Sequence, residues 1–196
     1  MNKKKIIILG SIVFVLVYAS LGIASAGTYD GKKAADYAYN NAYKGVSGSW
    51  YFAYAGGDCT NFASHALAAG GWTMNNFGRT NDLSWYYVAY APYLSSYTWG
   101  ASNNLHKYLA RSGRAYSSSI YSLEKGDIVQ FDIGCDGTWD HTMMVTDKRN
   151  GEIYLCYHTE DTRDIAFAKV KEKAEAQARA VGKDVQFSGW HINAQF

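Results

Sequence analysis

The sequence has few cysteines, no run of lysine and arginine after its first five positions, no internal repeat and no low-complexity segment. Its three cysteines, Cys59, Cys135 and Cys156, are too few for a disulfide scaffold, and their odd number leaves at least one thiol free. The lack of a basic patch argues against nucleic acid as a partner. No cofactor motif is present either, so we expect the protein to need no cofactor.

The first 26 residues have the pattern of a secretory signal. Lys3-Lys4-Lys5 is followed by an apolar run from Ile6 to Ile23 and by Ala24-Ser25-Ala26. We assign residues 27–196 to one domain, which has 16 basic and 17 acidic residues once the three leader lysines are subtracted from 19 and 17. A retained leader would instead act as a membrane anchor, because a span needs roughly 20 apolar residues. Both alternatives place the domain outside the cytoplasm, and we expect a monomer.

Tyrosine and tryptophan are abundant, with 17 and 6 copies. Amphipathic rings of this kind can pave a groove for sugars or extended peptides, but most are ordinary half-buried surface residues. The longest aromatic stretch, residues 72–100, is too apolar for a linker, so we expect a packed loop or a groove wall.

Hydrophobic periodicity predicts helices first and strands afterwards. Helices are expected at residues 30–43, from Cys59 to Gly70, at 101–112 and at 167–181. Alternating patterns predict strands at residues 126–133, 141–147, 152–158 and 185–193, and Asn150-Gly151 predicts a tight hairpin between the second and the third. This order indicates an α+β fold, with the helices on one side of an antiparallel sheet.

Cys59 opens a predicted helix directly after Gly56, Gly57 and Asp58. A helix N-terminus lowers the pKa of a thiol, and the two glycines allow a substrate to approach closely. Asp58 would cap the helix, and because a carboxylate opposes thiolate formation we assign it a structural role. A cysteine in this position, taken alone, is more often a buried and inert thiol.

Two histidines favour a catalytic role for Cys59 over that of a buried and inert thiol. If residues 150–151 form a two-residue turn, His141 faces Glu160, and His158 lies on the same sheet face as a diagonal neighbour, roughly 7–8 Å from His141. One imidazole can then act as base toward Cys59 while the other orients it. By the same parity Cys156 shares the face of His158, which favours a core thiol over a disulfide.

Five segments together resemble a known family: "GGDCTNFASHALAAGGW", "SWYY", "GDIVQFD", "DGTWDHTMMVT" and "IYLCYHTED". They are similar to the putative amidase domain family of secreted bacterial proteins, which is related to NlpC-type peptidases and CHAP amidases, and the match runs from about Tyr29 to Asp161. The resemblance implies a papain-like fold and a cysteine hydrolase that cleaves amide bonds in peptidoglycan peptides. It also implies Cys59 as nucleophile, His141 as base and His158 as orienting residue.

Further residues are assigned to the surroundings of this triad. The amide of Cys59 is a natural oxyanion donor and Tyr54 is a second candidate, while Asp58, Trp85 and Trp99 are assigned to the substrate groove. Residues 132–140 resemble a short calcium loop without its terminal glutamate, so we interpret them as a turn and expect no metal.

Two other functions remain open at this stage. A catalytically silent module could bind cell wall or glycan through stacking on exposed rings, for which the candidates are Trp85, Tyr86, Tyr87 and Trp99. A transpeptidase or transglutaminase would pass the same thioester to an amine instead of water.

Overall fold

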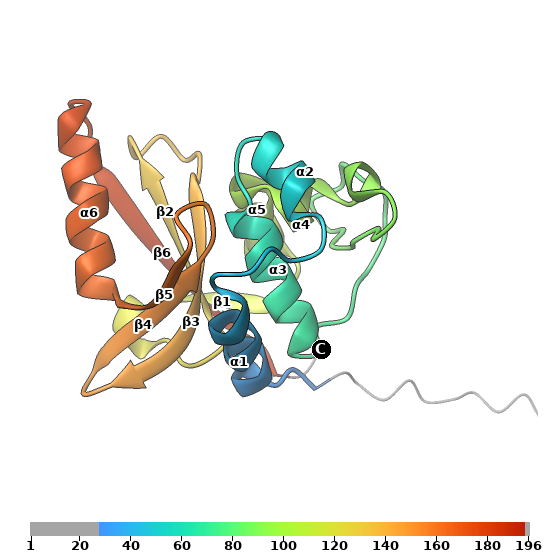
Figure 1. Cartoon of the computed structure of the whole chain (residues 1–196), viewed down its shortest axis with the longest axis horizontal. Coiled ribbons are helices and arrows are strands. Elements are labelled where there is room, and N and C mark those ends of the chain that lie inside the picture. Colours follow the sequence, from blue (N-terminus) through green and yellow to red (C-terminus); the bar gives the residue numbers. More distant parts are fainter. Residues whose placement is uncertain (1–27, 195–196) are drawn as a thin grey trace, which may run out of the picture.

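The computed structural model of the protein describes residues 28–194 (Figure 1). The predicted signal at residues 1–26 lies outside this range. Within it, no helix is both long enough and apolar enough to cross a membrane.

The first half of the described chain is helical and the second half contains the sheet. The helices are α1 (Gly31–Asn41), α2 (Ser49–Tyr54), α3 (Cys59–Ala69), α4 (Tyr97–Gly100), α5 (Ser102–Arg111) and α6 (Phe167–Ala180), with short 3-10 turns η1 (Pro92–Leu94) and η2 (Ile120–Ser122). The strands are β1 (Ala115–Ser118), β2 (Ile128–Ile133), β3 (His141–Arg149), β4 (Glu152–Tyr157), β5 (Thr162–Ala166) and β6 (Val185–Ile192). All four predicted helices and all four predicted strands are confirmed, and β1, β5, α2 and α4 were not predicted.

The six strands form one antiparallel sheet in the order β1-β6-β2-β3-β4-β5. Helices α1, α3 and α5 pack on one face, around a core that includes Phe62 and Leu105. Helix α6 covers the other face with Phe167 and Val170 (Figure 1). The α+β prediction is confirmed, but the prediction that the helices lie on one side is wrong for α6.

The central strands explain why both faces are covered. Neighbouring residues in β2, Ile128 and Val129, are fully buried, as are Met143 and Met144 in β3. Since successive side chains of a strand point to opposite faces, each of these strands is apolar on both sides. A helix is therefore needed on each face to remove this surface from water.

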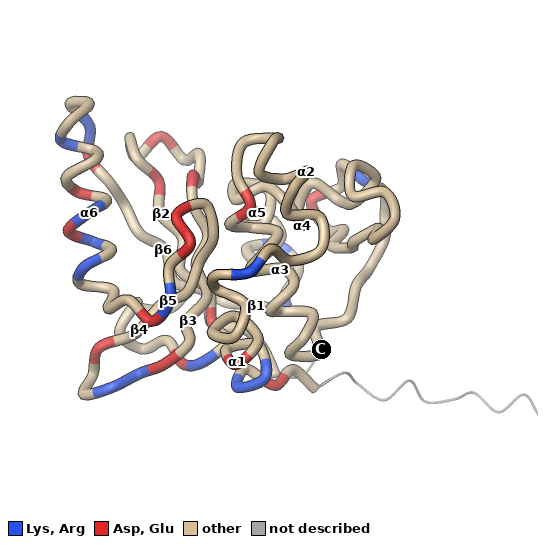
Figure 2. The backbone as a smooth tube through the Cα atoms, in the orientation of Figure 1, with Lys and Arg blue, Asp and Glu red and all other residues tan. Residues whose placement is uncertain are grey.

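Charged residues are distributed unevenly over the fold. Figure 2 shows lysine, arginine and acidic residues along α6 and the β3–β4 hairpin, whereas helices α2 to α5 carry few of them. The long connection after α3 is packed, as predicted, because Trp72, Trp85 and Trp99 are buried.

A β-bulge between Val145 and Asp147 changes the register of the β3–β4 hairpin. Near the turn, Arg149 pairs with Glu152, as a two-residue turn requires. Beyond the bulge, Met144 pairs with Cys156, one residue short of the predicted register. Because β3 has one extra residue at the bulge, the side chains from His141 to Val145 lie on the opposite face, relative to β4, from the one that the two-residue turn predicts.

The bulge separates the two histidines that the sequence pattern places together. His141 has the parity of Met143 and Val145, which belong to the core under α6. His158 has the parity of Cys156, which belongs to the core under α3. The prediction that His141 and His158 share a sheet face is therefore wrong, whereas the shared face of Cys156 and His158 is as predicted.

Candidate active site

Cys59 is the first residue of α3 and directly follows the loop that contains Gly56 and Gly57. Its side chain is 6% exposed. Gly56 has a φ of 122°, a conformation that favours glycine, and nothing lies within 4 Å of the position that a Cβ would take there. The backbone before the thiol is thus left open to a molecule approaching from solvent.

The thiol of Cys59 is poised to ionise near neutral pH. Burial alone would raise its pKa, but the charge and hydrogen bond of His141, the Thr142 amide and the Thr60 hydroxyl lower the pKa to about 7. The thiolate of Cys59 therefore forms at a lower pH than that of an ordinary cysteine.

A buried hydroxyl network lies beneath the thiol. The Thr60 Oγ1 lies 3.7 Å from the Cys59 Sγ and 3.1 Å from the Thr142 Oγ1. Gln130 donates to Thr142 at 3.1 Å and to the carbonyl of Ser102 at 2.9 Å. These bonds fix the hydroxyl of Thr60 next to the sulfur, where it can donate to a thiolate.

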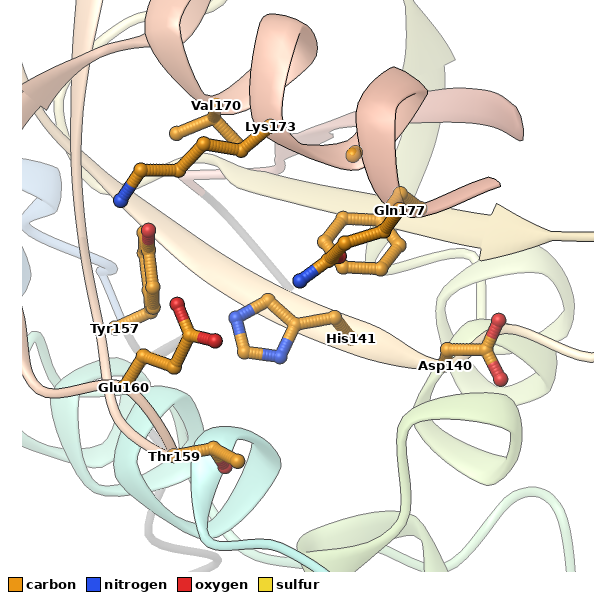
Figure 3. A pocket seen from close by; sticks show the side chains of 10 residues that line it. Asp140, His141, Tyr157, Thr159, Glu160, Val170, Lys173 and Gln177 are labelled. Atoms are coloured by element: carbon orange, nitrogen blue, oxygen red, sulfur yellow. The ribbon is translucent and has the colours of Figure 1, made fainter. Parts of the chain in front are cut away.

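His141 stands at the start of β3, at the end of the sheet nearest the N-terminus of α3. Its ring stacks on Phe131 with centroids 5.1 Å apart and meets the edge of Tyr157 at 4.9 Å. Figure 3 shows the side chains of Glu160 and Gln177 pointing toward this ring, the latter from α6. The imidazole is therefore held by packing on the α6 face of the sheet while it reaches Cys59.

One pocket is lined by His141, and a second is lined by the residues that directly precede Cys59. One, of about 210 Å³, lies between His141 and α6. The other, of about 450 Å³, lies along Gly56, Gly57 and Trp50. Thr159 lines both, and its hydroxyl accepts a 3.3 Å hydrogen bond from the Asp58 amide. Thr159 therefore lies between the two pockets and is bonded to the residue that precedes Cys59.

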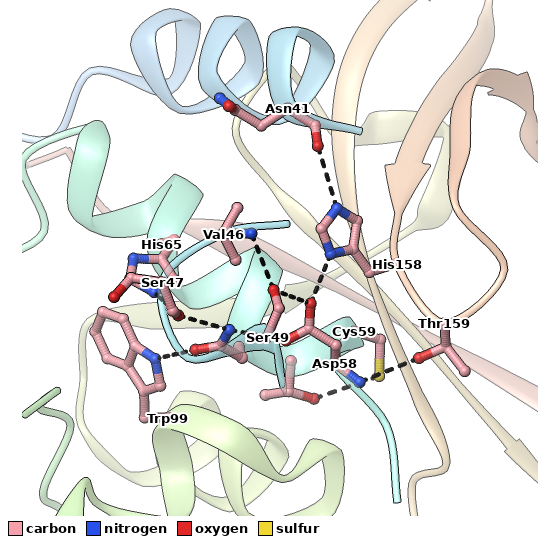
Figure 4. Close-up of polar contacts among 12 residues, drawn as sticks. Asn41, Val46, Ser47, Ser49, Asp58, Cys59, His65, Trp99, His158 and Thr159 are labelled. Atoms are coloured by element: carbon pink, nitrogen blue, oxygen red, sulfur yellow. Dashed lines mark hydrogen bonds and ion pairs between the residues drawn. The ribbon is translucent and has the colours of Figure 1, made fainter. Parts of the chain in front are cut away.

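His158 lies on the opposite face and does not contact His141. Its Nδ1 donates to Asp58 Oδ2 at 2.7 Å and its Nε2 donates to the carbonyl of Asn41 at 3.2 Å (Figure 4). Burial alone would lower the pKa of His158, but the bonds to Asp58 and Asn41 and the charge of Asp58 raise it. Both ring nitrogens face oxygen acceptors, an arrangement that favours the imidazolium form of His158 beside a buried carboxylate.

The prediction that Asp58 caps the amides of the helix is wrong. Asp58 occupies the N-cap position of α3 without a side-chain bond to the backbone. Its carboxylate instead accepts from Ser49 at 2.6 Å, from Asn61 at 2.8 Å and from His158. Asp58 therefore ties the loop before Cys59 to α2, α3 and β4.

The other residues assigned to the groove lie away from the thiol. Trp85 and Trp99 are fully buried, and their indole N–H groups donate to Ser64 and Asn61. The prediction that they line a groove or a stacking surface is wrong, because packing in the core removes them from solvent. Tyr54 is 92% exposed at the end of α2.

The remaining candidates have structural surroundings. All three cysteines are free, Cys156 is buried and Cys135 is exposed, which excludes a disulfide between them in this structure. In the 132–140 loop, Asp132 and Asp140 accept backbone amides of the loop and of β2, as expected of a turn. His65 lies 2.8 Å from the carbonyl of Ser47 and packs against Trp99.

The fold and this site define an α+β protein with a cysteine at a helix N-terminus and a histidine beside it at the end of a central strand. The chain belongs to the family described as "Putative amidase domain", whose model matches residues 28–181.

Two curated proteins of Bacillus subtilis (strain 168) are similar to it. YjcM is 28% identical over 156 residues, which are 74% of this chain and 34% of YjcM. YhbB is 31% identical over 120 residues, which are 59% of this chain and 34% of YhbB. Both are described as uncharacterized, and the matched part spans about a third of each. No solved structure matches the chain significantly.

Proposed function

We propose that the domain is a papain-like cysteine amidase in which Cys59 is the nucleophile and His141 the general base and acid. The observation that carries the proposal is the interaction of the two side chains, in which the charge and the hydrogen bond of His141 help lower the pKa of Cys59 to about 7. A thiolate held by an imidazolium is the attacking form in nucleophilic cysteine catalysis.

Each step uses a group of the chain that is already in place. The Cys59 sulfur attacks the amide carbonyl carbon, forming a C–S bond. The amide of Cys59 is a candidate donor to the developing oxyanion, because the first turn of a helix has N–H groups without intrahelical acceptors. His141 then protonates the leaving nitrogen as the C–N bond breaks. A water deprotonated by His141 hydrolyses the thioester and releases the acid.

Glu160 takes the positioning role that the sequence pattern assigns to His158. Its carboxylate points toward the imidazole of His141 (Figure 3), where it can stabilise the imidazolium that forms during the reaction. His158 cannot do this from the other sheet face, since its two ring nitrogens bind Asp58 and Asn41.

Replacing Glu160 with glutamine should lower kcat while KM stays nearly constant. A carboxylate at an exposed position near a charged group contributes about 0.2–1 kcal/mol, which corresponds to a loss of rate of up to roughly fivefold. Glu160→Asp should retain part of the activity, and Glu172→Gln, on the exposed side of α6, serves as the matched control. A Glu160→Gln variant with unchanged kcat and pH profile would remove this residue from the mechanism.

We further propose that the substrate is a peptide amide of peptidoglycan and that the domain acts outside the cytoplasm as a monomer. The leader pattern at residues 1–26 supports the location, and the family description supports an amide as the bond that is cleaved. The open loop at Gly56 and the pocket along Gly57 leave room for an extended peptide chain.

Digestion of purified peptidoglycan tests the proposal directly. Mass spectrometry should find products in pairs, with one new amino group and one new carboxylate at a single type of amide. Protein alkylated with iodoacetamide serves as the inactive control. Release of reducing sugar ends without new amino groups contradicts the proposal. A product joined to an added amine, such as glycinamide, would instead assign the thioester to acyl transfer.

A further inference from the structure

The inference that follows rests on the proposed function and concerns the pocket between His141 and α6. In amide cleavage the leaving nitrogen must come within hydrogen-bond reach of the general acid. The part of the substrate beyond that nitrogen therefore lies on the His141 side of Cys59. The pocket of about 210 Å³ next to His141 is the space available for it.

This pocket has an apolar wall and one ammonium group. Phe131, Tyr157, Val170 and Ala174 contribute the apolar surface, and Lys173 of α6 contributes the cation. Figure 3 shows the Lys173 side chain running along Val170 toward Tyr157.

Lys173 differs from the other lysines of α6. Lys169 and Lys171 form ion pairs with Glu172 and Glu175 at 2.9 and 3.3 Å. Lys173 forms no ion pair with any residue between 28 and 194. Its charge is consequently available to a ligand that enters the pocket.

Two acidic residues, Glu160 and Asp140, also line the pocket. Glu160 points toward the ring of His141 (Figure 3). Asp140 accepts a 2.7 Å hydrogen bond from the amide of Ile133, at the far end of the pocket from Lys173. Neither residue forms a salt bridge with Lys173, so the ammonium is not neutralised within the pocket.

We propose that this pocket binds the leaving group of the substrate and that Lys173 binds a carboxylate on that group. The leaving amine is then an amino acid or peptide that carries a free carboxylate, and not ammonia or a simple alkylamine. An amino-acid side chain of the leaving group would pack on Tyr157, Val170 and Ala174. Because Lys173 is exposed, the pair is expected to contribute only two- to fivefold in affinity, about 0.4–1 kcal/mol.

Binding to protein with Cys59→Ala tests the site without depending on turnover. The probes are the synthetic peptide L-Ala-γ-D-Glu-L-Lys-D-Ala and two analogues, one amidated at the D-Glu α-carboxylate and one amidated at the C-terminus. The parent should bind the free peptide two- to fivefold more tightly than at least one analogue. Adding Lys173→Gln should reduce that ratio to about one, and Lys173→Arg should restore it.

The matched control is Lys171→Gln, which lies on the same helix but pairs with Glu175 away from the pocket. It should keep the ratio of the parent. Equal binding of all three peptides by the parent, no binding of any peptide, or an unchanged ratio in Lys173→Gln would each overturn the proposal. If the ratio depends on Lys173 but the unsubstituted protein cleaves no peptidoglycan, the proposed function fails and the carboxylate site stands. If the unsubstituted protein cleaves peptidoglycan but the binding ratio does not depend on Lys173, the proposed function stands and the carboxylate site fails.

Discussion

Replacing Cys59 with alanine is expected to reduce amide cleavage in peptidoglycan to the background rate while the protein stays folded. The substitution removes the only atom that can form the thioester, and no neighbouring group replaces it, because Thr60 lies in a buried hydroxyl network. The melting temperature of the variant should remain close to that of the unsubstituted protein. Measurement of released amines, with circular dichroism as the test of folding, gives both results.

Replacing His141 with alanine tests the second member of the Cys59–His141 pair. Loss of general acid–base catalysis lowers kcat by roughly 100- to 10,000-fold. The pKa of Cys59, about 7 in the unsubstituted protein, should rise, because burial raises it and His141 contributes the largest opposing effect. The rate of alkylation of Cys59 by iodoacetamide, measured against pH, should therefore reach half its maximum at a clearly higher pH.

The free cysteine Cys135 provides the control for both measurements. It is exposed, so Cys135→Ala should leave cleavage unchanged and should also remove its background reaction with iodoacetamide. Burial raises the pKa of Cys156, which keeps that thiol unreactive in the neutral range. Full activity in Cys59→Ala, or an unshifted alkylation profile in His141→Ala, would contradict the assignment of the pair.

The sequence predicts most of the fold because its elements are local. Periodicity and end signals such as Asp30 and Gly70 are present in the residues themselves, and Asp30 does accept the amide of Lys33. The bulge at Thr146 carries no comparable signal. Its side chain lies 3.3 Å from the carbonyl of Tyr154 and 3.5 Å from the Cys156 sulfur, contacts that exist only once the hairpin has formed.

In the candidate site, too, some residues follow from local sequence features and others only from contacts in the folded structure. Cys59 and His141 follow from sequence features, a helix start and a strand start, and the structure brings them together. Lys173 and Gln177 could not be found in this way, because nothing in the pattern places α6 over the face of the sheet that carries His141. Glu160 was expected opposite His141 from the hairpin turn, but a role for it becomes visible only when His158 is found on the other face.

His158 is expected to matter for stability instead of for orienting the base. It forms an ion pair with Asp58 in which both side chains are nearly inaccessible to solvent, at 4% and 8% exposure. Its ring also stacks on Phe62 with centroids 4.0 Å apart. Through Asp58 and the Asn41 carbonyl, this one imidazolium joins β4 to α1 and to the start of α3.

Replacing His158 with glutamine should lower the free energy of unfolding by about 3 kcal/mol, because removal of one partner leaves a buried charge uncompensated. For a domain of this size the melting temperature should fall by about 6–12 °C. Asp58→Asn should have a similar effect, and the double variant should lose less than the sum of the two, since each single change already breaks the pair.

The loss in His158→Gln should also depend on pH, in a direction that the raised pKa of His158 determines. A group whose pKa is higher in the folded state stabilises the fold fully below its ordinary pKa, near 6.5, and that stabilisation declines as pH rises through the folded-state pKa. The difference between the unsubstituted protein and His158→Gln should thus be largest below about pH 6.5 and should become smaller as the pH rises above the folded-state pKa of His158. Urea unfolding at pH 5.5 and at a pH well above neutral measures this difference in the free energy of unfolding. His191→Gln is the control, because His191 pairs with Asp127 but is one-third exposed, so its replacement should lower the free energy of unfolding less.

Equal stability of His158→Gln and the unsubstituted protein at pH 5.5 would show that the pair does not hold the loop before Cys59. A difference that grows as the pH rises would mean that His158 is neutral in the folded protein.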